Sequence, residues 1–214
     1  MKERGILFSG KMVGEILADR KRQTRRVVKR NGEPLELHER HGLQPAYGTS
    51  PDGFDFGERG LWREVGPDYP DGPEDELRCP YGAEGDRLWV REAWRADGAG
   101  GVIFRASVED PRCNKWKPGI HLKRAHARIL LEITTLRVER AQAISEADAL
   151  AEGFAPVAGA GGALYPSGRA ARGPSTAREE FARYWREFNG EESWRSNPPV
   201  WVIGFEVLAK EPQS

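Results

Sequence analysis

The sequence predicts an α+β domain, in which strands and short helices combine and long loops interrupt them. Apolar residues recur at period two in 87–94, 127–139 and 201–207, which is typical of strands. Two other segments begin with a capping hydroxyl, at Ser9 and at Thr176, and then repeat apolar residues at helical spacing. These two patterns together favour a mixed sheet flanked by short helices.

The length and composition favour a single domain covering residues 1–214. A chain of 214 residues buries about 70% of its unfolded surface and folds without disulfides. Apolar residues make up 38% and charged residues 31%, and no apolar run approaches the roughly 18 residues that a membrane span needs. The first ten residues lack the apolar core of a signal peptide. We therefore expect a cytoplasmic protein with no membrane association.

Positive charge is concentrated in residues 20–30, although the chain carries 33 basic and 33 acidic residues. This segment, the basic run, holds seven lysines and arginines, no acid, and the hydroxyl of Thr24. A solvated face is the ordinary explanation of a charge run. However, the run directly follows an amphipathic helix, and Thr24 interrupts it. Both features favour the lining of a site for a phosphate-bearing ligand.

The basic run is predicted to join a helix to a strand. Ser9 caps a helix whose apolar stripe extends from Met12 to Leu17 and which ends in the range Asp19 to Lys21. The segment that begins at Thr24 is rich in β-branched residues and predicts a short strand. Lys21 and Thr24 are then neighbours across a tight turn.

Two segments are predicted to lie outside the regular fold. Residues 31–80 carry recurrent turn signals and one plausible strand at 60–65. Within them, residues 64–76 contain six acids and no base, which predicts a solvated acidic loop or, alternatively, a cover for the basic run. Residues 155–175 contain fourteen Gly, Ala or Pro among twenty-one and are expected to be a flexible insertion.

A carboxylate lies on the apolar face of the strand at 87–94, where Glu92 shares one side with Leu88 and Val90. A buried carboxylate must be paired or hydrogen-bonded, and the obvious partners are the cations of the basic run. A structural salt bridge and a contact with ligand are both open explanations of Glu92. In the next strand, a change of phase near Thr134 predicts a β-bulge.

Two further short helices are predicted in the second half of the chain. Ser145 begins a capped helix that closes at Glu152, with Gly153 just beyond it. The carboxylate of Glu152 therefore faces an unfavourable helix dipole. Thr176 begins the second helix, and its four large aromatic residues in 181–188 are more simply a core stripe than a base-stacking platform.

Lys21, Thr24 and Glu152 form a candidate set of base, nucleophile and acid. A threonine hydroxyl needs a base, and a lysine acts as one only when its pKa is pulled toward neutrality. Neighbouring arginines lower the pKa of Lys21, whereas the end of the preceding helix raises it. A carboxylate at a helix C-terminus retains its proton more readily, which suits a donor to a leaving amine. The set suits amide hydrolysis, and ordinary surface residues are the alternative explanation.

Four segments that include the basic run resemble the ASCH domain family, which has a PUA-like β-barrel fold associated with RNA and modified nucleosides. The four segments span nearly the whole chain and are Ile16–Arg26, Gly85–Glu92, Ile144–Gly153 and Val200–Phe205. The resemblance implies a PUA-like mixed β-barrel flanked by short helices, with long loop insertions.

Small bacterial members of that family are amidohydrolases that deacetylate N(4)-acetylcytidine with a lysine, a threonine and a glutamate. The motifs match these three residues to Lys21, Thr24 and Glu152. Segments 79–82 and 116–121 are more similar to longer members that phages and prophages encode. This chain is much longer than the small amidohydrolases, and the fold alone does not fix the activity.

The leading function is therefore hydrolysis of an acyl group from a modified nucleobase or nucleoside, without a cofactor. One alternative is a nuclease of single-stranded RNA, in which His121 and Lys21 transfer protons. The other is a non-catalytic module that binds RNA or DNA. The expected partner is a modified nucleoside or a single-stranded nucleic acid, and the question of protein partners is left open. The expected substrate-binding residues are Arg25, Arg26, Glu92, Trp116, His121 and Arg124.

No metal site is expected. Cys79 and Cys113 are too few for a disulfide framework, which favours a reducing compartment. Together with His121 and His126 they offer four zinc ligands on paper, but compact ligand pairs are missing. Tryptophans interleaved with lysines and arginines in this region, such as Trp116, suit stacking on a base or a single strand, and core packing explains some of them equally well.

Overall fold

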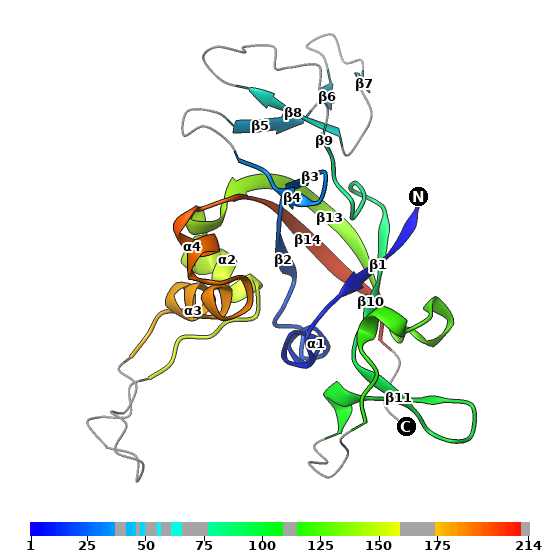
Figure 1. Ribbon diagram of the computed structural model, residues 1–214. Coiled ribbons are helices and arrows are strands. Elements are labelled where there is room, and N and C mark those ends of the chain that lie inside the picture. Colours follow the sequence, from blue (N-terminus) through cyan, green and yellow to red (C-terminus); the bar gives the residue numbers. More distant parts are fainter. Residues whose placement is uncertain are drawn as a thin grey trace.

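The computed structural model describes residues 1–36, 42–45, 48–49, 55–56, 61–65, 77–108, 115–158 and 174–210 (Figure 1). Two expectations fall largely outside these ranges: the cover of the basic run by residues 64–76, and the flexibility of residues 155–175.

A five-stranded mixed sheet forms the centre of the fold, with strand order β1-β10-β13-β14-β2. β1 pairs with β10 in parallel, and the other neighbours are antiparallel. The fold is α+β, as predicted, and among the described strands β1 and β2 are the edges of a sheet that does not close into a barrel. The strands are β1 (Glu3–Leu7), β2 (Gln23–Val27), β10 (Arg87–Arg91), β13 (Ile129–Arg140) and β14 (Pro199–Lys210).

β14 lies in the interior of this sheet, and both of its faces are covered from Val200 to Phe205. The predicted bulge is confirmed, because the register between β13 and β14 shifts between Ile133 and Thr135. Gly204 lies opposite this irregularity, and the hydroxyl of Thr135 occupies the position that a side chain at Gly204 would need. The bulge and the glycine therefore fit one another.

The segment 31–80 contains more strands than the sequence predicts. The strand expected at 60–65 is confirmed as β8, but it is the middle of a small sheet with order β5-β8-β9. β3 pairs with β4, and β6 pairs with β7. Most of these strands have two residues, which is too short for period two to be visible. They are β3 (Lys29–Arg30), β4 (Glu33–Pro34), β5 (Gly42–Pro45), β6 (Gly48–Thr49), β7 (Asp55–Phe56), β8 (Leu61–Val65) and β9 (Leu77–Arg78).

The strand predicted at 87–94 is divided, because β10 ends at Arg91 and Trp94 starts a separate hairpin. This hairpin and the short helices that follow it form an insertion between β10 and β13. Its elements are β11 (Trp94–Ala96), β12 (Val102–Phe104), η1 (Arg105–Ser107), η2 (Gly119–His121) and η3 (Arg124–His126).

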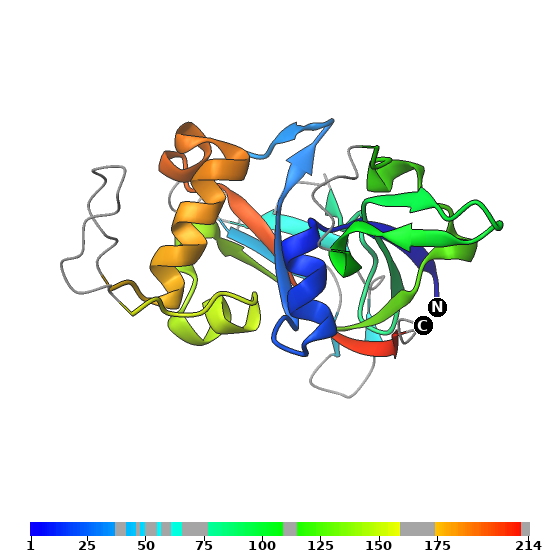
Figure 2. The same cartoon turned by 90° about the horizontal axis from the view of Figure 1, so that it is seen from below.

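The helices pack against the sheet as their caps and apolar stripes predict. Ser9 caps α1 (Gly10–Leu17), and Thr176 caps α3 (Ala177–Asn189), where it forms a capping box with Glu179. α1 lies between α3 on one side and the insertion on the other (Figure 2). In the described part of the chain, no helix is long and apolar enough to cross a membrane. The remaining helices are η4 (Ala141–Ala143), α2 (Glu146–Ala151) and α4 (Glu191–Arg195).

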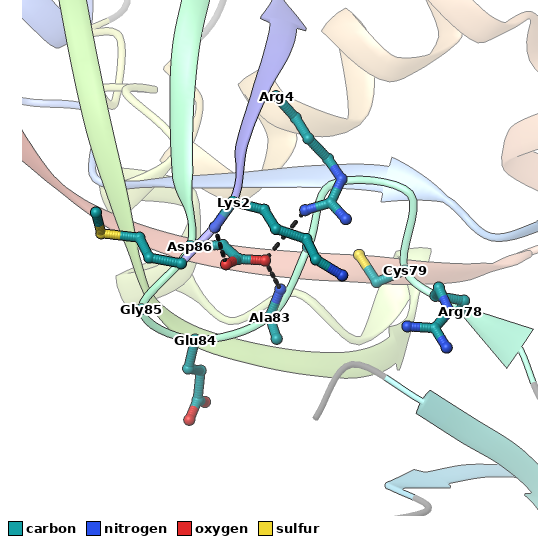
Figure 3. Close-up of a pocket in the computed structure, with 10 residues that line it drawn as sticks. Lys2, Arg4, Arg78, Cys79, Ala83, Glu84, Gly85 and Asp86 are labelled. Atoms are coloured by element: carbon teal, nitrogen blue, oxygen red, sulfur yellow. Dashed lines mark hydrogen bonds and ion pairs between the residues drawn. The ribbon is translucent and has the colours of Figure 1, made fainter. Parts of the chain in front are cut away.

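β1 is a strand that was not predicted from the sequence. The carboxylate of Asp86 connects it to the loop before β10 (Figure 3). This carboxylate accepts hydrogen bonds from the Lys2 backbone N–H at 2.6 Å, the Arg4 guanidinium at 3.1 Å and the Ala83 N–H at 3.3 Å. Burial opposes these donors, but together they hold the pKa of Asp86 below its ordinary value. A cavity of about 390 Å³ lies beside this contact. Burial raises the pKa of the Cys79 thiol in its wall to about 11, so the thiol stays protonated.

Replacing Gly82 by alanine is expected to lower the free energy of unfolding by about 1–3 kcal/mol. Gly82 has a φ of +116°, and a Cβ there would lie 2.7 Å from Asp86 Oδ2 and 2.8 Å from Arg4 Nη1. Chemical denaturation measures the loss. Gly98→Ala is the matched control, because Gly98 has a φ of +88° but no atom within 4 Å of such a Cβ. Equal losses in the two variants would show that crowding of the Asp86 contact contributes nothing.

Candidate active site

A cavity of about 220 Å³ opens between α1, β2 and α3, and Lys21, Thr24 and Glu152 line it together. The three residues are distant in the sequence or separated by a turn, yet the fold brings them to one wall. Both expectations about their proximity are therefore met: Lys21 and Thr24 lie at one site, and Glu152 joins them. Aromatic side chains contribute much of the remaining wall: Phe8, Phe154, Phe181, Tyr184, Trp185 and Phe188.

The backbone at the end of α1 turns Lys21 inward. α1 ends at Leu17, earlier than predicted, and Asp19 adopts a left-handed conformation with φ +58°. Lys21 then forms an isolated antiparallel bridge with Glu152 at the end of α2. Gly153, with φ +87°, permits this approach, because a Cβ there would lie 3.2 Å from the Lys21 Cβ. Local chain reversals thus fix the lysine against the carboxylate.

Lys21 and Glu152 form a buried ion pair. The Lys21 Nζ donates to Glu152 Oε2 at 2.7 Å, to the Glu152 carbonyl at 2.9 Å and to the Gln23 carbonyl at 2.7 Å. The side chains are 1% and 4% exposed. Burial lowers the pKa of Lys21, the carboxylate of Glu152 opposes this, and the charges of Arg26 and Arg25 add to the lowering. The net effect is a lysine that loses its proton more readily than an exposed one.

Arg25 contacts Glu152 from the other side. Its guanidinium lies 3.4 Å from Glu152 Oε1, 2.7 Å from Glu139 Oε2 and 3.2 Å from Asp148 Oδ2. Arg137 completes the network at 2.6 Å from Glu139 and 3.0 Å from Asp148. Two further cations and two further carboxylates therefore surround the Lys21–Glu152 pair. Arg25 lines the cavity, but with its side chain fully buried and engaged by carboxylates it positions Glu152.

Arg26 offers a hydrogen-bond donor at the cavity wall. One guanidinium nitrogen donates to the Leu7 carbonyl at 2.5 Å, and the group lies over the Phe8 ring at 5.1 Å. Its Nε is buried and has no hydrogen-bond partner among the described residues. Thr24, from the same strand, is 4% exposed. The wall therefore combines a hydroxyl, an unsatisfied donor and a cation beside an aromatic ring.

α3 supplies an aromatic wall that the sequence analysis interpreted as core. The interpretation is correct for Phe181 and Trp185, which are both 3% exposed. It is wrong for Phe188, which is 59% exposed, lines the cavity and lies with its ring centroid 4.3 Å from that of Tyr184. Helical spacing predicts which residues share a face, but it does not show where the core ends along the helix.

Comparison with known proteins finds no matching family model, curated sequence or solved structure. What the site can do chemically is therefore inferred from its own residues. No group of three or more His, Cys, Asp or Glu side chains that could hold a metal ion occurs among the described residues. Cys113, one of the four zinc ligands considered from the sequence, lies outside the described ranges.

Glu92 is not part of this cavity, and its predicted partner is wrong. Its carboxylate accepts two hydrogen bonds of 2.8 Å from Arg128, and both side chains are buried. Glu92 follows β10, and two strands separate β10 from the basic run on β2. Arg128 directly precedes β13, the neighbour of β10. The structural salt bridge is thus the explanation that the structure supports.

Three other expected binding residues lie in the insertion and do not line the cavity with Lys21. His121 is exposed on η2, and Arg124 pairs with Glu3 at 2.8 Å. Trp116 packs under the Arg95 guanidinium at 5.5 Å. The insertion lies on the opposite side of α1 from α3, which separates these residues from the catalytic candidates (Figure 2). Their expected place in the pocket is therefore corrected.

Three residues that support Glu152 were not singled out from the sequence: Asp148, Glu139 and Arg137. A weak signal existed, because Arg137 and Glu139 are charged residues that alternate with apolar ones on a predicted strand. Their contact with α2 depends on how the strand packs, which spacing along the chain does not show.

Proposed function

We propose that this protein is a hydrolase that removes an acyl group from the exocyclic amine of a modified nucleobase. The supporting observation is the buried Lys21–Glu152 pair beside Thr24 in an aromatic-walled cavity. At about 220 Å³ the cavity is smaller than the roughly 300–1,000 Å³ of pockets for drug-sized ligands. This size suits one base, and the rings of Phe8, Tyr184 and Phe188 suit stacking on it.

The proton transfers balance with the residues present. Neutral Lys21 takes a proton from the Thr24 hydroxyl, or from a water that Thr24 positions, as the oxygen attacks the acyl carbonyl. The carbon–nitrogen bond then breaks, and the proton passes from Lys21 through Glu152 to the leaving nitrogen. If an acyl-threonine forms, a water then attacks it with the same proton transfers. The proton passes to the leaving Thr24 oxygen, which restores the hydroxyl. One amide and one water give one carboxylic acid and one amine.

The surroundings of the pair suit this reaction electrostatically. Burial lowers the pKa of Lys21, so the neutral amine forms at a lower cost than in an exposed lysine. Arg26 lines the cavity, and its guanidinium charge suits the negative charge that develops on the carbonyl oxygen. Arg25 holds Glu152 in place from behind. Each part of the reaction thus has a residue suited to it.

The same proposal places the chain in the ASCH family with a PUA-like fold. Its support is the arrangement that the resemblance implies: lysine and threonine at a helix-to-strand turn, and glutamate at the end of a short helix. The mixed sheet agrees with it at the level of α+β architecture. A nuclease that uses Lys21 with His121 has less support, because His121 lies in the insertion outside the cavity.

Thr24→Val is expected to lower hydrolysis of N(4)-acetylcytidine by at least about 100-fold. Valine keeps the shape of threonine and removes the hydroxyl, so the buried ion pair stays intact. Mass spectrometry of a panel of N-acyl nucleosides measures release of the acid and the free nucleoside. Thr134→Val, an exposed threonine of β13, is the control and should keep the wild-type rate. A wild-type protein that hydrolyses no member of the panel would exclude the proposal, as would full activity in Thr24→Val.

A further inference from the structure

The insertion between β10 and β13 carries a charge excess that the cavity does not explain. Residues 93–128 contain eight lysines and arginines against three acids, in a chain with equal numbers of both. We name the described part of this insertion, residues 93–108 and 115–128, the basic platform. In a chain with no net charge, such a local excess of positive charge favours a polyanionic partner over a solvated face as its explanation.

The charge of the basic platform is only partly neutralised within the described structure, where Arg124 pairs with Glu3 and Arg128 pairs with Glu92. Its single acid, Asp97, accepts hydrogen bonds from the backbone N–H groups of Ala99 and Gly101 and closes the β11–β12 turn. Lys115 and Lys123 are exposed, and neither forms an ion pair with a described residue. Their ammonium groups are therefore available to phosphates.

Aromatic rings lie among these cations. The Lys117 ammonium lies 4.9 Å from the Trp94 ring centroid, and the Arg95 guanidinium lies 5.5 Å from that of Trp116. His126 stacks on Trp94 with centroids 6.4 Å apart and an angle of 20°. Trp94 Nε1 and Arg95 Nε are buried without hydrogen-bond partners among the described residues. Interleaved rings and cations are typical of surfaces that bind single-stranded nucleic acid.

The basic platform is joined to the mouth of the cavity. Leu7 lines the cavity and is the β-sheet partner of Arg91, whose guanidinium donates to the carbonyls of Gly119 and Ile120 on η2. Leu7 is 42% exposed and Ile120 is 51% exposed, so each end of this link presents an exposed apolar side chain. A strand that enters the cavity at Leu7 would next meet η2.

We infer that the basic platform binds the sugar–phosphate backbone of a single-stranded nucleic acid while the cavity takes one base of that strand. This inference rests on the proposed function of the cavity. It makes the substrate a modified base within a strand rather than a free nucleoside. The cations hold successive phosphates, and the apolar residues at the mouth contact the sugar and base beside the one that is bound.

Fluorescence anisotropy with labelled single-stranded oligonucleotides tests the surface. Lys115→Ala/Lys123→Ala is expected to reduce the salt slope of the logarithm of the affinity by about 1.4, because each phosphate contact contributes about 0.7 for a single strand. The matched control is Arg178→Ala/Arg195→Ala, which removes equal charge from exposed sites outside the platform and the basic run. Parallel measurements with RNA and DNA oligonucleotides show which of the two sugars the surface prefers. Equal losses in both variants, or displacement of the strand by polyglutamate of equal charge, would overturn the inference.

A second measurement separates this inference from the proposed function. The kcat/KM for an oligonucleotide with a single N(4)-acetylcytidine is compared with that for the free nucleoside. We expect the strand to be preferred, and the preference to fall in Lys115→Ala/Lys123→Ala. Binding that depends on the platform without any hydrolysis would leave the surface standing and exclude the proposed function. Hydrolysis with no preference for the oligonucleotide would support the proposed function and exclude the inference about the platform.

Discussion

Lys21→Met is expected to lower the rate of amide hydrolysis by a factor of about 10²–10⁴, the usual contribution of a general base. Methionine fills the buried volume but removes the amine that takes the proton of the nucleophile. The substitution also leaves Glu152 beside Arg25 alone. Breaking a buried pair by removing one partner costs about 3–5 kcal/mol in the free energy of unfolding. Kinetics with the acyl nucleoside and chemical denaturation measure the two effects.

The double variant Lys21→Met/Glu152→Gln distinguishes loss of chemistry from loss of fold. Removing both charges relieves the uncompensated carboxylate, so the double variant is expected to be more stable than Lys21→Met while it remains inactive. Arg20→Met is the control, because Arg20 is 62% exposed and pairs with Glu15 outside the cavity. Wild-type hydrolysis in a folded Lys21→Met variant would remove Lys21 from the mechanism.

Local patterns predicted the parts of the fold that depend on neighbouring residues. The caps at Ser9 and Thr176, the strand at Thr24 and the bulge near Thr134 each follow from a few adjacent side chains, and all are confirmed. β1 was missed because its position depends on Asp86, a residue far along the chain that accepts hydrogen bonds from Lys2 and Arg4. Long-range contacts of this kind leave no periodicity in the sequence.

In the candidate site, too, the residues that could be predicted are those whose positions depend on nearby sequence or on the family resemblance. Lys21 and Thr24 are close in the sequence, and the resemblance to a family added Glu152, so the three could be placed together before the structure was known. The partner of Glu92 could not, because strand order decides it and the sequence does not show strand order. Trp116 was placed in the pocket on its chemistry, whereas the structure separates its insertion from the cavity by α1.

Glu152→Gln is expected to shift the pH dependence of hydrolysis toward acid and to lower its plateau. The active form needs neutral Lys21, so kcat/KM rises with pH through the pKa of Lys21, which lies below the 10.5 of an ordinary lysine. The carboxylate of Glu152 raises that pKa, and its removal therefore lowers the pKa further. Loss of the proton path to the leaving nitrogen lowers the plateau by a factor of about 10²–10⁴. Initial rates across the pH range measure both.

Arg26→Gln is expected to shift the pH dependence of hydrolysis in the opposite direction to Glu152→Gln. The charge of Arg26 lowers the pKa of Lys21, so its removal is expected to move the rising limb toward higher pH. A general loss of packing at the cavity would not move the two variants in opposite directions. Shifts of the same sign in Glu152→Gln and Arg26→Gln would show that the limb does not report the ionisation of Lys21. Opposite shifts would tie the base to the buried amine, since the carboxylate raises the pKa of Lys21 and the guanidinium lowers it.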